Sequence, residues 1–110
     1  MTFTEKQLAQ SYPNATTNTT VYTVPAVTKT IVKNINFCNS TVAAITVRVF
    51  AVPFGGSAGV SNALFYDYEI PEYFSINKNM YLILDTVGDF LVVYVSAQGI
   101  TFTISGAEIT

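Results

Sequence analysis

The sequence contains no histidine and no tryptophan, a single cysteine and few charged residues. Without histidine it lacks the usual base of Ser-His-Asp and Cys-His catalysis and the commonest protein ligand of metal ions. Because Cys38 is alone, no disulfide can form within the chain, and packing or assembly must supply its stability. Charged residues make up 11% of the chain, against about 25% in typical domains. Thr, Ser, Asn and Tyr side chains, or neighbouring subunits, must therefore cover its surface.

Basic clusters and long apolar runs are also missing. The net charge is −2 and the isoelectric point is about 4.7, so nucleic acid is not an expected partner. The longest apolar runs, near Leu82–Leu84 and Phe90–Val95, are much shorter than a membrane span, so we expect no membrane partner. The first ten residues, MTFTEKQLAQ, lack the apolar segment of a secretory signal. We therefore expect a protein that is made in a cytoplasm and stays soluble.

After residue 20, apolar and polar residues alternate with a period of two through most of the chain. A chain of 110 residues corresponds to one domain. The sequence predicts an all-β fold: a single antiparallel, jelly-roll-like β-sandwich of about eight short strands over residues 21–110. The expected strands are Thr20–Val24, Thr28–Cys38, Ala44–Val52, Ala63–Ile70, Tyr73–Ile76, Met80–Leu84, Phe90–Ser96 and Ile100–Ser105, with a turn at 77–79 and a flexible loop at 53–62.

Residues 1–20 do not share this alternation and are predicted to form an N-terminal docking arm. Thr4 and Gln7 have the spacing of a helix capping box, and Phe3 and Leu8 stand at the positions of its hydrophobic staple. We expect one or two helical turns here, ended by Tyr12–Pro13. An arm outside the sandwich could be removed, so deletion of residues 1–13 is expected to leave the sandwich folded.

Carboxylates are the only groups in the sequence that could pair for catalysis, and they are sparse. Asp67 and Glu69 lie on one face of an expected strand, about 7 Å apart by the strand rise, a spacing that resembles a glycosidase pair. No cleft signal surrounds them, so we interpret them as part of a solvated face. Asp85 and Asp89 are interpreted as a hairpin turn that uses Gly88, because calcium sites usually need more oxygen ligands.

The remaining polar candidates carry no chemistry either. Cys38 is interpreted as a small buried residue near a strand end. Asn14, Asn18 and Asn39 each begin an N-x-Ser/Thr triplet, which in this composition says nothing about glycosylation. The sequence therefore predicts a protein that is not an enzyme and that binds no metal and no cofactor.

Aromatic residues are plentiful, with seven Tyr and eight Phe. Most aromatic side chains in a sandwich fill its core, but the alternation predicts outward positions for Phe50, beside Arg48, and Phe65, beside Asp67. Outward aromatics with few charges are typical of a subunit interface. A sugar-binding platform built from Tyr66 and Tyr68 would leave the same signature, and this alternative stays open.

Several short segments resemble a pattern in small all-β virion proteins of tailed bacteriophages, which begin a sandwich with YTVPAG, a strand and an N-x-Ser/Thr turn. The resemblance covers roughly residues 21–108, and Val27 stands where that family usually has glycine. A glycine there with positive φ could be copied by valine only with strain. The segments that carry the resemblance are Tyr22–Ala26, Thr30–Ile35, Cys38–Thr41, Gly55–Gly59 and Phe102–Gly106.

The resemblance implies a structural protein of a bacteriophage virion, located in the particle and without a cofactor. The first interpretation is a capsid decoration protein that binds through multivalent, non-covalent contacts. The alternatives are a tail component, such as a fibre, adaptor or spike subunit, and, in another class, a carbohydrate-binding or adhesin module.

The implied partners are other virion proteins, either the major capsid protein or tail proteins, together with further copies of the chain in a homo-oligomer such as a trimer. A host glycan is the partner in the adhesin alternative. The arm is expected to dock, and the loop 53–62 is expected to face outward or contact a neighbour. The candidate contact residues are Phe3, Leu8, Tyr12, Pro13, Phe50, Phe54 and Phe65.

Overall fold

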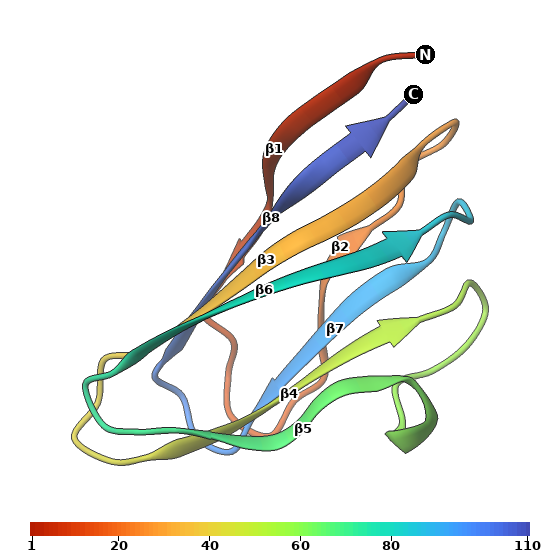
Figure 1. Cartoon of the computed structure of the whole chain (residues 1–110). Helices are drawn as coiled ribbons and strands as arrows, with labels where there is room; N and C mark the ends of the chain where they lie inside the picture. Colours follow the sequence, from red (N-terminus) through yellow and green to blue (C-terminus); the bar gives the residue numbers. More distant parts are fainter.

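Two four-stranded antiparallel sheets lie face to face in the computed structural model, which describes residues 1–110 (Figure 1). Sheet A has the strand order β1-β8-β3-β6 and sheet B the order β2-β7-β4-β5. The predicted all-β sandwich is thereby confirmed. The strands are β1 (Phe3–Ser11), β2 (Thr19–Thr23), β3 (Lys29–Asn39), β4 (Ile45–Val52), β5 (Ala63–Ile70), β6 (Ser75–Leu84), β7 (Phe90–Val95) and β8 (Ile100–Ile109), with one 3-10 turn, η1 (Val60–Asn62).

The core lies between the sheets and is built from alternate residues of the strands, as the period of two requires. Val47 and Val49 of β4 and Ile35 and Phe37 of β3 are fully buried in it. The rings of Phe37 and Phe102 meet edge to face, with centroids 5.5 Å apart. Aromatic and β-branched side chains of both sheets thus fill one continuous core.

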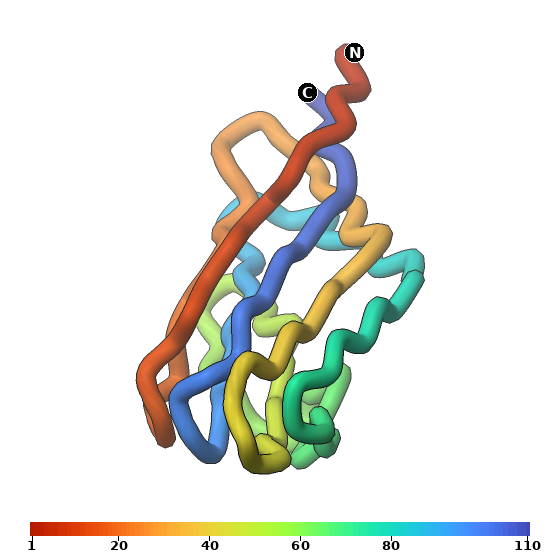
Figure 2. Tube along the Cα trace, turned by 90° about the vertical axis from the view of Figure 1, so that its left-hand side faces the viewer, coloured from red at the N-terminus to blue at the C-terminus, as the bar shows by residue number.

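The helical turn expected near the N-terminus is wrong, because residues 3–11 form strand β1. This strand pairs with β8 from Phe3↔Ile109 to Ser11↔Phe102, and Figure 2 shows the two running side by side. The backbone edge of β8 offers a whole row of hydrogen bonds, more than a local capping box supplies. Ala9 is buried in the core. Residues 1–13 are thus part of sheet A, and deleting them would expose β8 rather than remove a free arm.

A second difference concerns β6, where the sequence predicts a short strand, a turn at 77–79 and another strand. The structure has one continuous strand, Ser75–Leu84. Asn77 and Asn79, which favour a turn locally, lie opposite β3 and accept hydrogen bonds from the side-chain amide of Asn34. Pairing with the long strand β3 therefore overrides the local turn signal.

Sheet A bends along a line where its register shifts. Relative to β8, β1 has an extra residue, Leu8, between the partners of Ser105 and Ile104. β3 has an extra residue, Lys33, between the partners of Gly106 and Ser105. At this bend the β8 backbone comes so close to β3 that a Cβ on Gly106 would lie 2.0 Å from the carbonyl oxygen of Ile31. Glycine in a strand often marks such a close approach of two backbones.

Val27, at the turn between β2 and β3, has φ of 57°. The valine thus adopts the left-handed conformation that the resemblance led us to expect of glycine, and its side chain is 84% exposed. A β-branched residue in this region is strained by about 1–3 kcal/mol. The turn is held by a hydrogen bond from the Thr28 hydroxyl to the carbonyl oxygen of Ala26, at 2.9 Å.

Replacing Val27 by glycine is therefore expected to raise the free energy of unfolding by about 1 kcal/mol. Relief of strain should exceed the extra entropy of glycine in the unfolded chain, which costs about 1 kcal/mol. Chemical denaturation of both proteins measures the difference. The matched control is Val42→Gly, at an exposed valine without a positive φ, which should lose stability. A loss in Val27→Gly as large as in the control would contradict the strain argument.

Candidate contact surfaces

The seven candidate contact residues do not gather on one surface. Phe3, Tyr12 and Phe54 are exposed. Pro13 is buried, and Leu8 is half-buried and packs against the core from β1. Phe50 and Phe65 also differ from the prediction, for two separate reasons.

Phe65 points inward because β5 has a bulge. Val49 pairs with Phe65 and Val47 with Tyr68, so one residue of β4 faces two residues of β5, and Asp67 has φ of 54°. The bulge reverses the alternation and turns both Phe65 and Tyr68 toward the core. The ring centroid of Phe65 lies 5.3 Å from that of Phe37. The predicted outward position of Phe65 is wrong for this reason.

The same bulge affects the proposed sugar platform. Tyr66 remains on the outer face of sheet B, where it is exposed, while Tyr68 packs from the edge of β5 against the core. The two rings thus lie on opposite faces of one strand. They cannot stack on one sugar together.

Phe50 does lie on the outer face of sheet B, as predicted, but it is covered. With Val52 and Val92 it forms a small buried cluster, against which Ala58 of the 53–62 loop packs. The loop is fastened by Asn62, whose side chain accepts a hydrogen bond from the Gly59 N–H (3.1 Å) and donates one to the Ser57 carbonyl oxygen (3.0 Å). The loop therefore covers its own sheet.

Arg48 is the centre of a polar cluster on the rest of this face. Its guanidinium lies between the rings of Tyr66 (4.2 Å) and Tyr94 (4.7 Å) and donates two hydrogen bonds to Asp67, at 2.7 and 3.3 Å. These bonds raise the pKa of Arg48 and lower the pKa of Asp67. A carboxylate held ionised by an arginine is unsuited to act as a general acid, so Asp67 and Glu69 do not resemble a glycosidase pair in their surroundings.

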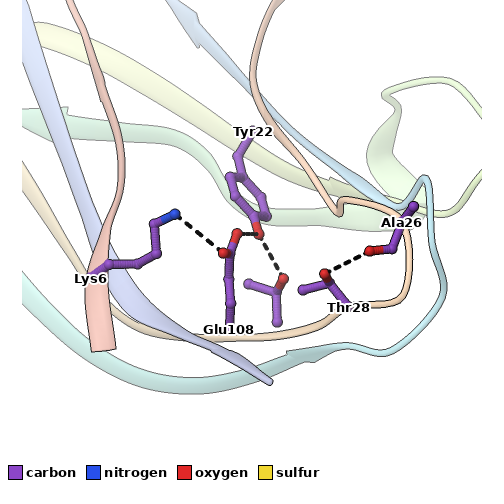
Figure 3. A network of polar contacts seen from close by, with 6 residues as sticks. Lys6, Tyr22, Ala26, Thr28 and Glu108 are labelled. Carbon is purple, nitrogen blue, oxygen red and sulfur yellow. Dashed lines mark hydrogen bonds and ion pairs between the residues drawn. The ribbon is translucent and has the colours of Figure 1, made fainter. Parts of the chain in front are cut away.

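A second polar cluster closes the sandwich near the termini (Figure 3). The Tyr22 hydroxyl donates a hydrogen bond to Glu108 (2.6 Å) and, because its proton is used there, accepts one from the Thr30 hydroxyl (2.7 Å). Lys6 donates to the other Glu108 oxygen at 3.2 Å. Burial and the bond to Glu108 raise the pKa of Tyr22 to about 12. The bond from Tyr22, and then Lys6, lower the pKa of Glu108. Four strands are thus joined by one network.

Replacing Tyr22 by phenylalanine is expected to lower the free energy of unfolding by about 1–3 kcal/mol at neutral pH, because Glu108 and Thr30 lose a buried partner. The loss should depend on pH. The lowered pKa of Glu108 contributes stability above its ordinary value of 4.5 that disappears as the pH falls below it. The raised pKa of Tyr22 contributes stability below 10.0 that disappears as the pH rises to about 12.

Denaturation of wild type and Tyr22→Phe across this pH range gives the measurement. The difference in free energy of unfolding between wild type and Tyr22→Phe should be largest between pH 4.5 and pH 10.0. It should become smaller below and above this range. Contributions that do not depend on the Tyr22 hydroxyl are the same in both proteins and cancel in the difference. If this difference does not change with pH, the hydrogen bond between Tyr22 and Glu108 is not its source.

The most exposed apolar group that is held on a rigid frame lies at the end of the sandwich opposite the termini, where the loops 40–44 and 71–74 meet (Figure 2). We call it the apolar tip, and it consists of Val42, Tyr73 and Phe74, exposed by 70%, 68% and 52%. Backbone hydrogen bonds join the loops, from the Tyr73 N–H to the Thr41 carbonyl oxygen and from the Asn39 N–H to that of Phe74.

Asn39, a buried residue at the end of β3, fixes the shape of the apolar tip through its side-chain hydrogen bonds. Its buried amide group donates to the carbonyl oxygens of Ala43 (2.9 Å), in the first loop, and Ile70 (3.0 Å), the last residue of β5 before the second loop. Its carbonyl oxygen accepts from the Thr41 N–H (2.9 Å) and hydroxyl (2.7 Å). The Asn39-Ser40-Thr41 triplet is thus a structural clasp. Tyr73, with φ of 49°, is held in a strained conformation that projects its ring into solvent.

The sequence reasoning missed the tip because it assigned Tyr73 to a strand. The signal that could have found it is Pro71-Glu72, which ends β5 and begins a turn. Other exposed apolar residues outside the candidate set include Tyr81 and Ile83 on β6. No three His, Cys, Asp or Glu side chains lie close enough to share a metal ion. No helix of the structure has the length and apolar composition to cross a bilayer.

Comparisons with known proteins give a likeness of structure only. No family model matches the sequence, and no curated protein matches it. A chain in the structure of infectious bursal disease virus, Gx strain, superposes with a TM-score of 0.52 and 13% identity over 97% of this chain and 32% of that one. A chain of the Gt strain gives 0.52 and 11% identity, over 97% and 30%.

A chain in the crystal structure of the T13 particle of the same virus gives a TM-score of 0.52 and 9% identity, over 97% of this chain and 29% of that one. The chain therefore spans about a third of the length of the virus chains that it matches. At these identities the likeness concerns the fold alone. The chain has a β-sandwich fold that also occurs in the chains of virus particles.

Proposed function

We propose that this chain is a structural protein of a bacteriophage particle, and that it decorates the capsid by non-covalent contacts repeated over the shell. The observation that carries the proposal is the apolar tip, whose three exposed side chains stand on a frame held by Asn39. Rigid aromatic anchors are the residues that dominate binding at protein interfaces. Because the frame is already ordered, little entropy is lost when the tip docks.

Two further observations support a role in a virion. The segments Tyr22–Ala26 and Cys38–Thr41 resemble those of small phage virion proteins, and in the structure they form the turn before β3 and the clasp after it. The fold is shared with chains of virus particles. Both observations concern the β-sandwich and its turns, so the role that we propose is structural and not enzymatic.

The size of the tip fits many weak contacts better than one strong contact. Three side chains bury far less area than a stable one-to-one interface, which needs about 1,000 Å² or more. Attachment to a symmetric shell multiplies such contacts, since each bound copy holds its neighbours at a high local concentration. A homo-oligomer would present several tips at once.

Immunogold electron microscopy on the phage particles, with antibody raised against this chain, tests the proposal. Gold spread over the heads at high copy number is the expected result. Gold confined to the tail, at low copy number, would replace decoration by a tail role. No gold on any particle would overturn the virion assignment.

A binding assay with purified particles that lack the chain tests the tip itself. Tyr73→Ala and Phe74→Ala together are expected to reduce occupancy at least tenfold. The matched control is Phe54→Ala, at an exposed phenylalanine in the 53–62 loop rather than at the tip. The mass of each variant in solution is compared with that of wild type, so that altered assembly is not mistaken for altered docking. Full occupancy by the tip variant would show that another surface docks.

A further inference from the structure

We propose that β6 is a pairing edge for a second copy of this chain. The two β6 strands would run antiparallel about Asn77 and join two copies of sheet A into one continuous sheet. The inference rests on the edges of the sheets and does not depend on the particle to which the protein belongs.

Four strand edges have no partner in the structure, those of β1, β2, β5 and β6. An open edge invites pairing with another chain unless it is short, bulged or charged. β5 has the bulge at Asp67 and two carboxylates, Asp67 and Glu69. β2 has five residues and a register shift after Thr20. β1 has an extra residue at Leu8 and carries Glu5 and Lys6 on the edge strand itself.

β6 is the least charged of the three long edge strands. It is ten residues long and has one charged residue, Lys78. The Lys78 ammonium lies 5.4 Å from the ring centroid of Tyr68 in the same chain, so the cation is engaged within the molecule. From Ser75 to Asn79 the strand pairs residue for residue with β3, and the shift in register comes only after Asn79. This five-residue segment is therefore a regular open edge with a single charge, whereas the equally regular segment of β1, Phe3–Gln7, carries two.

The segment is also complementary to itself. Antiparallel pairing about Asn77 places Ser75 opposite Asn79 of the other copy and Ile76 opposite Lys78. No lysine then faces a lysine, and a like-charge pair directly across the strands is avoided. A two-fold axis through Asn77 makes each copy contribute the same surface, as a closed dimer requires.

The row of side-chain amide hydrogen bonds on β3 and β6 would continue across the two-fold axis into the second copy. Asn77 donates hydrogen bonds to the side-chain oxygens of Asn34 (3.2 Å) and Asn36 (3.3 Å) on β3, and Asn34 donates back to Asn77 and to Asn79 (2.9 Å). An amide has two donors and an oxygen with two lone pairs. Both donors of Asn77 are used within the chain, but the Asn79 side chain only accepts there, so its amide donors can bond the Ser75 hydroxyl of the other copy and extend the row. The exposed face of β3 and β6 thus matches a second copy in chemistry as well as in backbone.

Light scattering coupled to gel filtration, over a range of concentrations, tests the proposal on the full chain. Wild type is expected to run at twice the mass of one chain, which is 12.0 kDa. Asn77→Lys places two lysines opposite each other and is expected to weaken dimerisation at least tenfold. Gln10→Lys is the matched control, since Gln10 is exposed on the other edge strand of sheet A, and it should leave the dimer intact.

A charge-swap mixture makes the test specific to the two-fold axis. Asn77→Lys and Asn77→Asp should each be monomeric, and an equal mixture should recover the dimer. A wild type that is monomeric throughout, a trimer, or a mixture that stays monomeric would overturn the proposal. Equal weakening by Gln10→Lys would do so too.

Hydrogen exchange on wild type tests the proposal without any variant, so it is still decisive if a variant fails to fold. Amides of residues 75–79 should become more protected as the concentration rises, while those of β1 should not change. Protection that is independent of concentration in β6, or that rises in β1 or β5 instead, would also contradict pairing through β6. These outcomes leave the particle assignment untouched, because immunogold labelling tests that separately.

Discussion

Replacing Gly106 by alanine is expected to lower the free energy of unfolding by about 3 kcal/mol, at the upper end of the range for overpacking. The new methyl carbon would lie 2.0 Å from the carbonyl oxygen of Ile31 and 3.0 Å from Cδ1 of Leu8. Leucine could turn away, but the Ile31 carbonyl belongs to a strand paired on both sides, to β8 and β6. The clash can be relieved only by separating β8 from β3 in the middle of sheet A.

Thermal and chemical denaturation of Gly106→Ala measure this loss. A change of this size corresponds to a fall in the melting temperature of about 13 °C for a domain of this length. Gly59→Ala is the matched control, because a methyl group there would have no atom within 4 Å of it and the φ of −167° is extended backbone. The control should stay within about 0.5 kcal/mol of wild type. If both variants matched wild type, the close approach of β3 and β8 would be wrong.

The strands with the strongest alternation were predictable from the sequence. β4 is Ile45–Val52 against an expected Ala44–Val52, and β5 agrees with its expected limits. In these segments the apolar residues face a core on one side, so local pattern and tertiary structure favour the same conformation. The two-sheet sandwich follows from the number and spacing of such strands.

Strand β1 could not be predicted in this way. Its residues are polar and exposed over most of their length, so they show no alternation. What makes them a strand is the open edge of β8, which is about a hundred residues away in the sequence. Local capping signals at Thr4 and Gln7 therefore favoured a helix that the fold does not contain.

The contact surface was harder to predict than the fold. Outward positions were assigned by counting alternate residues, and one bulge at Asp67 reverses the count for Phe65, so that it lies on the inner face together with Tyr68. Phe50 was assigned correctly to an outer face, but a loop folded over it. Whether a side chain on an outer face is exposed thus depends on which other segments pack over it, and the local sequence does not show this. The exposed Tyr73 and Phe74 were assigned to a strand because the turn after Pro71 was not recognised.

Replacing Asn39 by alanine is expected to lower the free energy of unfolding by about 3 kcal/mol. Its side chain, 1% exposed, makes four hydrogen bonds. The variant removes these partners from the Ile70 carbonyl oxygen and the Thr41 N–H, while the Ala43 carbonyl oxygen keeps its bond from the Thr41 hydroxyl. Each buried group left unpaired costs about 1–3 kcal/mol. Asn39→Asp should be at least as destabilising, because a carboxylate would face two carbonyl oxygens that need a donor.

Denaturation of Asn39→Ala and of the control Asn18→Ala separates the clasp from the sequence triplet, because Asn18 begins the same N-x-Thr pattern on an exposed loop. The control should match wild type. Hydrogen exchange should show faster exchange of loops 40–44 and 71–74 in Asn39→Ala, with β1 and β8 unchanged. If docking uses the apolar tip, this variant should also bind particles more weakly although Tyr73 and Phe74 are intact. Unchanged stability and unchanged loop exchange would contradict the clasp, and the tip would then lose the preordered frame on which its proposed role depends.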